Sequence, residues 1–369
     1  MKQTQAFLST YTADVSGVCS ALFELGGMTV MHDASGCNST YNTHDEPRWY
    51  DMDSLVYISG LSELEAVMGD DEKLITDIVD AARQLHPRFI ALAGTPIPMI
   101  TGCDLPAIAG RTNIPSFAVP SNGIRTYVAG AGQALRLYAE RFITSRPEKR
   151  KNAVNILGAT PLDFSVNGCV QSMARRLEEA GFTLQSVFAM SSSIDAIDKA
   201  GAAEANLVVS SVGLPAAQSL QAQFGTPYVI GAPFGDFFSP YVFDALRESI
   251  RTGAPADVLG TFAPDAPDTV IVGESVTAKS LAAALAVGYG IRARVICPVE
   301  APGGVLGACD LRLEDEEEIE QALRGAKRVI ADPLYRRIVP KTSEFYALPH
   351  EAFSGRIYRR QIPNLAERV

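Results

Sequence analysis

The chain has 369 residues, of which 47% are hydrophobic, and it carries a formal net charge of −10 at pH 7. This length is enough for two or three domains that each bury a core of their own. The acidic balance excludes a general binder of nucleic-acid backbones, because such binding depends on clustered Lys and Arg. The sequence has neither a secretory signal at its start nor an apolar run long enough to span a membrane, so we expect a cytoplasmic protein without nucleic-acid or membrane partners.

Residues 14–50 form the first unusual segment, because they show no clear helical or strand period. The segment is rich in glycine and holds two cysteines and two histidines, namely Cys19, His32, Cys37 and His44. A long irregular segment inside a compact chain is usually functional, and glycines let the backbone approach a bulky inorganic group closely. We therefore expect a loop that carries chemistry.

From residue 73 onward, amphipathic helical stretches alternate with short apolar runs that end in glycine or proline. Residues 73–87 ("KLITDIVDAARQLHP") predict a helix and residues 88–94 ("RFIALAG") the strand that follows it. The alternation restarts near residues 152 and 268, which indicates repeated βα units on parallel sheets. The predicted fold is α/β, with three flavodoxin-like or Rossmann-like parallel-sheet domains in series at 1–150, 151–265 and 266–369, the last with a polar, Arg-rich tail.

Ligands of open parallel sheets bind outside the carboxyl ends of the strands. The turns around the glycines at 158, 213, 235 and 273 are therefore expected to line a cleft that the domains share. None of these turns has the spacing of a P-loop or of a dinucleotide-binding fingerprint. The sequence thus predicts a cleft but no nucleotide in it.

The six cysteines are expected to be reduced, since no secretory signal precedes them and no Cys-x-x-Cys pair occurs. Iron–sulfur clusters need several thiolates from separate turns, and Cys19 and Cys37, eighteen positions apart, suit that need. Cys103, in a loop rich in proline and glycine after the strand at 88–94, is the third candidate ligand. The alternative is that these cysteines are small buried hydrophobic residues.

Four stretches in order resemble the nitrogenase component 1 family, which includes the subunits of the molybdenum–iron protein and the dark-operative protochlorophyllide reductase. The stretches are "GVCSALFELGG", "DASGCNSTY", "LSELEAVMGDDEKL" and "TPIPMITGCDL". The resemblance implies that Cys19 and Cys37 are cluster ligands in an N-terminal cluster-binding domain. Thr95 stands where the family has its third cysteine, and Cys103 replaces an aspartate on the same loop. Either Cys103 is the substitute ligand, as we expect, or the site uses only two thiolates from each chain.

The resemblance also implies partners and an activity. It implies an oxidoreductase subunit that forms a homodimer, or a heterodimer with a related component 1 subunit, and holds a 4Fe–4S cluster or a larger one at the interface. An ATP-dependent reductase of the nitrogenase iron-protein type would supply electrons for a substrate in the interdomain cleft. Ser59 and Glu63 are weaker candidates for tuning such a cluster.

No molybdenum–iron cofactor is expected. Ser210 stands where the resemblance places a cofactor cysteine, and no histidine lies between His86 and His350. Two alternatives to an enzyme stay open at this point. One is a non-catalytic scaffold or carrier for the maturation of a metal cofactor, and the other is a metal-free protein of the same fold that binds a small molecule.

Overall fold

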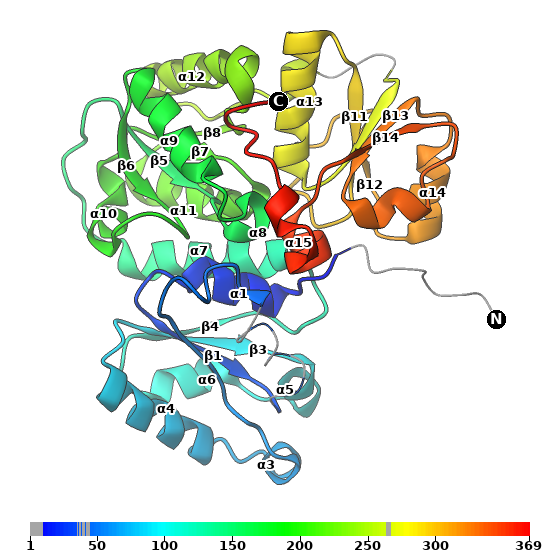
Figure 1. The fold of residues 1–369 in the computed structure, drawn as a ribbon. Helices are drawn as coiled ribbons and strands as arrows, with labels where there is room; N and C mark the ends of the chain where they lie inside the picture. The colour runs from blue at the N-terminus through cyan, green and yellow to red at the C-terminus, as the bar shows by residue number, and fades with distance from the viewer. Residues whose placement is uncertain (1–9, 35, 37, 39–40, 42–44, 263–266) are drawn as a thin grey trace.

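The computed structural model describes residues 10–34, 36, 38, 41, 45–262 and 267–369. Within them the strands form three separate parallel sheets, which confirms the predicted fold class. In Figure 1 the first sheet lies below, and the second and third lie side by side above it. The predicted domain limits after residues 150 and 265 stay predictions. No helix in these ranges has both the length and the apolar character needed to cross a bilayer.

The first sheet has the strand order β2-β1-β3-β4. Its strands are β1 (Met28–His32), β2 (Leu55–Ile58), β3 (Ile90–Gly94) and β4 (Ser116–Val119). One core joins one face of the sheet to α4 (Glu72–Leu85) and α6 (Leu105–Arg111), while α1 (Asp14–Leu22) and α7 (Tyr127–Phe142) pack on the opposite face. Two short helices, α3 (Glu63–Met68) and α5 (Pro96–Thr101), follow the carboxyl ends of β2 and β3.

The second sheet has the order β6-β5-β7-β8-β9, which is 2-1-3-4-5 in chain order and thus flavodoxin-like. Its strands are β5 (Ala153–Leu157), β6 (Thr183–Val187), β7 (Ala205–Val208), β8 (Tyr228–Ile230) and β9 (Ala256–Asp257). The helices between and after them are α8 (Pro161–Phe164), α9 (Cys169–Glu179), α10 (Ile194–Asp198), α11 (Leu214–Phe224) and α12 (Gly235–Thr252).

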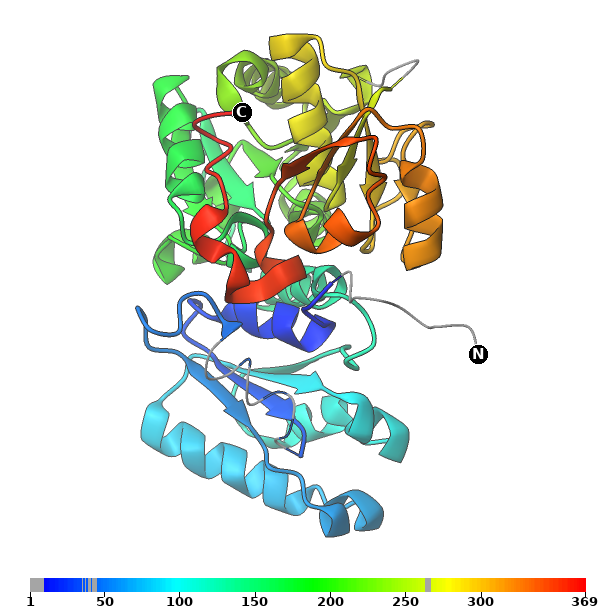
Figure 2. The same ribbon diagram turned by 45° about the vertical axis from the view of Figure 1, so that its right-hand side comes forward.

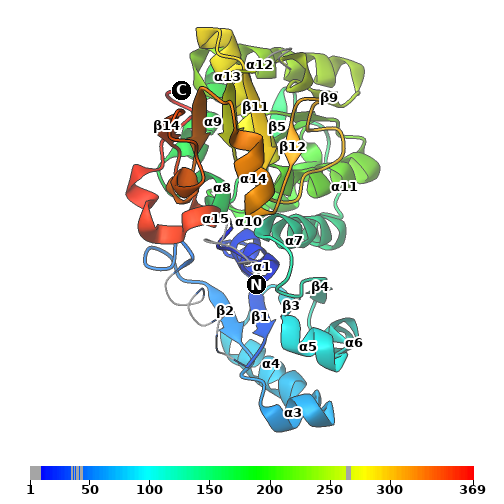
Figure 3. The ribbon, with the colours of Figure 1, turned by 90° about the vertical axis from the view of Figure 1, so that its right-hand side faces the viewer.

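The third sheet has the order β12-β11-β10-β13-β14, which is 3-2-1-4-5 in chain order and thus Rossmann-like. Its strands are β10 (Thr269–Val272), β11 (Ala293–Cys297), β12 (Leu311–Arg312), β13 (Arg328–Ala331) and β14 (Glu344–Ala347). The helices α13 (Ser275–Tyr289), α14 (Glu316–Leu323) and α15 (Glu351–Ser354) accompany it. Figure 3 shows this unit and the second stacked above the first.

The prediction that residues 14–50 lack regular structure is wrong for two parts of the segment. Residues 14–22 form α1 and residues 28–32 form β1. Every residue of α1 is buried, so the helix has no polar face that would produce a helical period. Every residue of β1 is buried as well, so the strand shows no alternation. Burial on all sides therefore hid both elements from the sequence analysis.

Helices α1 and α7 cross with their backbones in direct contact. A Cβ added to Gly17 would lie 2.2 Å from the Tyr127 carbonyl oxygen, and one added to Gly130 would lie 1.9 Å from the Asp14 carbonyl oxygen. Only glycine fits at these two positions. The Asp14 carboxylate accepts hydrogen bonds from the backbone N–H groups of Asn122 and Gly123, at 2.9 and 2.8 Å. The crossing is thus fixed by packing along the helices and by hydrogen bonds at the start of α1.

The tail after β14 is a packed part of the structure, although the sequence predicted only that it is polar. Phe353 and Ala366 are buried in it. The Leu365 carbonyl oxygen accepts a hydrogen bond from Gly235 N at 3.0 Å, which joins the tail to the second unit. Near its start, the Ala352 carbonyl oxygen accepts one from Thr12 Oγ1 at 3.1 Å. Figure 2 shows the tail, in red, running between the second and third units.

The glycine requirement at the helix crossing can be tested by Gly130→Ala. The added methyl group has no room against the backbone of α1, so the free energy of unfolding should fall by about 1–3 kcal/mol or more. Urea denaturation followed by circular dichroism measures this. Gly110→Ala, in α6, is the matched control because nothing lies within 4 Å of its added Cβ. It should raise stability by up to about 1 kcal/mol, and equal effects of the two variants would contradict the crossing.

Candidate functional site

Cys19 lies on α1, in a helix rather than in the predicted loop, and its side chain is fully buried. Burial, followed by the nearby Glu46 carboxylate, raises the pKa of the Cys19 thiol well above its usual value. Glu46 is itself held in place by Tyr41, whose hydroxyl donates to Glu46 Oε2 at 2.9 Å. Cys19 is therefore a protonated thiol at neutral pH unless a metal ion replaces its proton.

A buried charge network next to Cys19 was not predicted from the sequence. The Arg48 guanidinium contacts Glu46 Oε1 at 2.6 Å and Glu24 Oε1 at 2.8 Å. It also donates to the carbonyl oxygens of Ser20 on α1 and of Ala189 in the second unit, at 2.7 and 2.8 Å. The network fastens the segment after residue 45 to α1. The charged run "DEPRW" at 45–49 is the signal that could have indicated it.

A hydrogen-bonded cluster closes the carboxyl ends of β1, β2 and β3. Thr95, at the place of the family's third cysteine, donates from Oγ1 to the His32 carbonyl oxygen at 2.8 Å and to Asp33 Oδ1 at 3.0 Å. Ser59 Oγ lies 2.9 Å from His32 Nδ1, so this predicted neighbour does reach the strand end that precedes Cys37. Burial lowers the pKa of His32 and thus favours its neutral form.

Cys37 and His44 lie outside the described residues. Asn38, the residue after Cys37, donates from Nδ2 to Asp33 Oδ2 at 2.8 Å. This hydrogen bond holds Asn38 close to Asp33, the residue that follows β1. Glu63, the other predicted tuning residue, is exposed in the first turn of α3.

The structure does not bring Cys103 and Cys19 together. Cys103 packs against the core formed with α4 and α6, whereas Cys19 belongs to the core on the other face of the first sheet. The Cys103 sulfur lies 3.7 Å from Asp71 Oδ1. Burial and this carboxylate raise the pKa of Cys103 to about 12. Cys103 thus follows α5 to a place away from Cys19, although it is near Thr95 in sequence.

The described residues alone do not fit an iron–sulfur cluster. Within them, no group of three or more His, Cys, Asp or Glu side chains could hold a metal ion. A 4Fe–4S cluster takes four thiolates, and of the two predicted ligands that the structure describes, Cys19 alone lies on the α1 side of the sheet. A cluster would therefore need Cys37 and thiols from a second chain.

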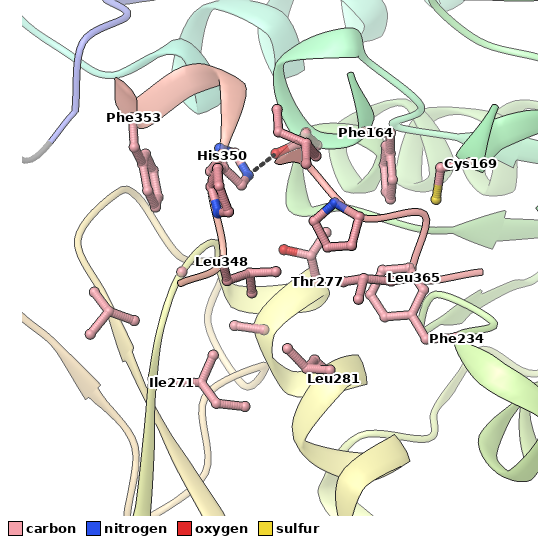
Figure 4. A pocket seen from close by; sticks show the side chains of 17 residues that line it. Phe164, Cys169, Phe234, Ile271, Thr277, Leu281, Leu348, His350, Phe353 and Leu365 are labelled. Carbon is pink, nitrogen blue, oxygen red and sulfur yellow. Dashed lines mark ion pairs between the residues drawn. The ribbon is translucent and has the colours of Figure 1, made fainter. Parts of the chain in front are cut away.

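A cavity that opens to solvent lies where the second unit, the third unit and the tail meet. Figure 4 shows its wall, which is mostly apolar and includes Phe164, Phe234 and Leu281. The side chains on the wall that carry an acidic, imidazole, hydroxyl or thiol group are those of Asp163, Cys169, Thr277 and His350. Of the four glycines whose turns were expected to line a cleft, Gly273 lines this cavity, whereas Gly158, Gly213 and Gly235 are not among its lining residues.

Asp163 joins α7 to the start of α8 at the edge of this cavity. From α8, its fully buried carboxyl group accepts hydrogen bonds from the Tyr127 hydroxyl on α7 and from Thr160 Oγ1. Burial, with a further contribution from Glu274 at the start of α13, raises the pKa of Asp163 to about 7. Asp163 can therefore gain or lose a proton near neutral pH.

The sequence analysis singled out none of the polar side chains of this cavity, and His350 is one of them. Its Nδ1 accepts a hydrogen bond from Ala352 N at 3.3 Å, and its ring stacks on Phe353 with 4.4 Å between centroids. Burial lowers the pKa of His350 to about 4, so the ring is neutral at pH 7. Because Nδ1 accepts, Nε2 carries the proton. Nε2 is buried, has no hydrogen-bond partner among the residues that the structure describes, and lies 3.7 Å from Asp163 Oδ1, the pair marked in Figure 4.

Comparison with known proteins decides the family. Residues 16–257 match the profile described as "Nitrogenase component 1 type Oxidoreductase". The chain belongs to this family. The resemblance found in the sequence is thereby confirmed, and the matched range of this nitrogenase component 1 type protein includes Cys19, Cys37, Cys103 and Asp163.

The curated relatives are distant and longer than this family member. It is 26% identical over 181 residues to a subunit of the light-independent protochlorophyllide reductase of Nostoc punctiforme, covering 45% of this chain and 36% of the relative. It is 24% identical over 183 residues to the nitrogenase molybdenum-iron protein alpha chain of Clostridium pasteurianum. This match covers 47% of this chain and 33% of the relative. It is 28% identical over 196 residues to the nitrogenase iron-molybdenum cofactor biosynthesis protein NifE of Methanosarcina barkeri. This match covers 48% of this chain and 42% of the relative.

Among solved structures, the chain is similar to one described as "Nitrogenase Cp1 at pH 5". The TM-score is 0.65 at 15% sequence identity, and the match covers 99% of this chain and 88% of the other. This likeness shows that the two chains share a fold. The sequence matches to these curated relatives each span less than half of the relative. The activity and the partners of this chain are therefore matters for a proposal.

The buried charge network can be tested by Arg48→Met. Removing the guanidinium leaves Glu46 and Glu24 without their cation, so the free energy of unfolding should fall by about 3–5 kcal/mol. Urea denaturation measures this. The matched control is Arg88→Met, which breaks the more exposed pair between Arg88 and Asp198 and should cost at most about 1 kcal/mol. A similar small loss for both variants would contradict the role of the network.

The raised pKa of Asp163 predicts how stability depends on pH. The folded protein holds a proton on Asp163 up to about pH 7, whereas the unfolded chain loses it near the ordinary value of 3.8. The stabilising contribution of the protonated form is therefore complete below about pH 4 and is lost as the pH rises to 7. The stability of the wild type, measured relative to Asp163→Asn by urea denaturation, should fall over this window. If the difference in stability between the wild type and Asp163→Asn stayed constant or rose between pH 4 and pH 7, the raised pKa of Asp163 would be contradicted.

Proposed function

We propose that this protein is an oxidoreductase subunit that holds an iron–sulfur cluster at a dimer interface through Cys19 and Cys37. Electrons from an ATP-dependent reductase of the nitrogenase iron-protein type would reduce a substrate in the cavity beside His350. The observation that carries the proposal is the family match over residues 16–257, which contains both cysteines. The curated relatives named as part of a reductase and as a nitrogenase chain support the same class of activity.

The count of thiols supports a paired arrangement. Cys19 and Cys37 give two thiolates per chain, and two chains together give the four that a 4Fe–4S cluster takes. In the other form of this proposal, a related component 1 subunit takes the place of the second copy and supplies the remaining thiolates. Cys103 stays a prediction as a ligand, and its placement on the opposite face of the sheet from Cys19 gives it no support.

An exposed apolar surface supports partner binding near the carboxyl end of the first sheet. It is formed by Leu64, Val67 and Met68 on α3 and by Met99 and Ile100 on α5, and the two helices are in contact. Ile100 is 78% exposed and Val67 is 76% exposed. Exposed apolar patches on proteins usually mark interaction sites. This patch adjoins the strand ends at which Thr95 and Ser59 lie, so a protein partner would bind close to the proposed cluster.

A second candidate function is that of a scaffold or carrier in the maturation of a metal cofactor. The relative that is named as a cofactor biosynthesis protein favours it. Turnover separates the two functions, because an enzyme oxidises its reductase partner repeatedly in the presence of substrate. A scaffold transfers one equivalent of its cargo and stops.

The proposed cluster can be tested by analysing iron and acid-labile sulfide in protein purified without oxygen. We expect about two irons per chain in a brown dimer, the value for one 4Fe–4S cluster shared by two chains. Cys19→Ala and Cys37→Ala should each lose most of this iron, because each removes two of the four thiolates from the dimer. Visible absorption of the same samples measures the loss independently.

Cys103→Ala is the matched control, since Cys103 lies away from Cys19. Under this proposal it should keep the iron content of the wild type, and a loss of iron would restore Cys103 as a ligand. The proposed cluster would be overturned if Cys37→Ala kept the iron content of the wild type. It would also be overturned if the wild type, co-purified with a related subunit, contained no iron. Melting curves of all variants show whether each is folded.

A further inference from the structure

We propose that the cavity beside His350 binds an uncharged, largely apolar organic molecule through a hydrogen bond from His350 Nε2 to a carbonyl-type oxygen of that molecule. The inference rests on the proposed function only in treating this cavity as the substrate site. It concerns the chemical class of the ligand, which neither the family match nor the relatives determine for this chain.

His350 carries a buried hydrogen-bond donor that lacks a partner among the described residues. His350 Nδ1 is occupied as the acceptor for Ala352 N, so Nε2 is the N–H of the neutral ring. This N–H is buried, makes no hydrogen bond within the described part of the chain, and lies too far from Asp163 Oδ1, at 3.7 Å, for a good one. Leaving a buried donor unpaired is unfavourable. A ligand oxygen at the cavity wall would satisfy it.

The charges around the cavity disfavour an anion. Among the described residues that line the cavity there is no Lys or Arg, and the carboxyl group of Asp163 on its edge is influenced by that of Glu274 at the start of α13. A carboxylate or phosphate would therefore be placed beside acidic groups without a cation to pair with. An uncharged oxygen, as in a ketone, an ester or an amide, accepts the hydrogen bond without that repulsion.

The wall of the cavity consists mostly of apolar side chains. The side chains of Phe164, Phe234, Ile271, Leu281 and Leu365 surround the polar edge. A buried water molecule usually makes about three hydrogen bonds, and the apolar side of this cavity offers it none. An organic molecule can fill the apolar side and still present one oxygen to His350. The site thus suits a ligand with one polar end better than it suits water.

Three small aromatic probes of similar size test the proposal on the purified full-length chain. They are acetophenone, which has a carbonyl oxygen, α-methylstyrene, which has a CH₂ group in its place, and benzoate, which is charged. Dissociation constants can be measured by calorimetry or by NMR titration. We expect acetophenone to bind about five- to tenfold more tightly than α-methylstyrene, the effect of one neutral hydrogen bond. Benzoate should bind more weakly than acetophenone.

His350→Asn is the test variant, because asparagine keeps an acceptor for Ala352 N at the start of α15 but has no group in the position of Nε2. It should bind both uncharged probes with equal affinity. Leu281→Ala is the matched control on the apolar wall, and it should weaken both probes while keeping the preference for the ketone. In the wild type labelled with ¹⁵N-histidine, acetophenone but not α-methylstyrene should shift the Nε2 resonance of His350, a readout that needs no variant.

Equal binding of the ketone and the hydrocarbon to the wild type would overturn the proposal. So would a ketone preference that persists in His350→Asn, a tighter binding of benzoate, or the absence of saturable binding by any probe. These measurements need no iron, no reductase and no second subunit. A failure here therefore leaves the cluster proposal standing, and a failure of the iron analysis leaves this one standing.

Discussion

The direct backbone contact between α1 and α7 is the constraint on which the arrangement of the molecule depends. Gly17 and Gly130 allow the two helices to cross without intervening side chains. On its other side α7 packs against α11 of the second unit, where a Cβ on Gly132 would lie 3.3 Å from Pro215. One helix therefore joins the first sheet to the second, and Cys19 and Tyr127 take their positions from the same crossing.

The same crossing relates the two candidate sites to each other. Cys19 lies on the α1 side of the contact, whereas Tyr127, in the first turn of α7, donates to Asp163 at the cavity. The region that would hold a cluster and the region that would hold a substrate are thus attached to neighbouring helices. Tyr127 therefore contacts both regions, since its carbonyl oxygen lies at the helix crossing and its hydroxyl group bonds Asp163.

How much of the fold could be predicted from the sequence depended on exposure to water. Residues 73–87 were predicted as a helix, and the structure has α4 at Glu72–Leu85, because one face of that helix is solvated and its apolar residues show a period. The same contrast between faces is missing in α1 and β1, which are buried on every side. The second and third sheets could be predicted because each begins with a strand that is followed by a glycine turn and a helix.

The candidate site was less predictable, because side chains meet through long-range contacts that no local pattern records. Cys103 lies eight residues after Thr95 in sequence, yet α5 carries it to the opposite face of the sheet from Cys19. His350 follows the last strand in a tail that appeared only polar, and it reaches the cavity because that tail returns between two units. Arg48 pairs with Glu24 across the intervening strand β1, which no helical or strand spacing would indicate.

The hydrogen bond from Thr12 to the Ala352 carbonyl oxygen spans 340 positions of the chain, and it has a consequence for the order of folding. During synthesis α1 can pair with α7 as soon as about the first 142 residues are available, because both helices lie within them. The tail that supplies His350 is made much later. Contacts this distant in sequence form slowly. The wall of the cavity therefore stays incomplete until residue 365 has been made, and in that interval phenylalanine and leucine side chains that line it, such as Phe164, Phe234 and Leu281, lack their final cover.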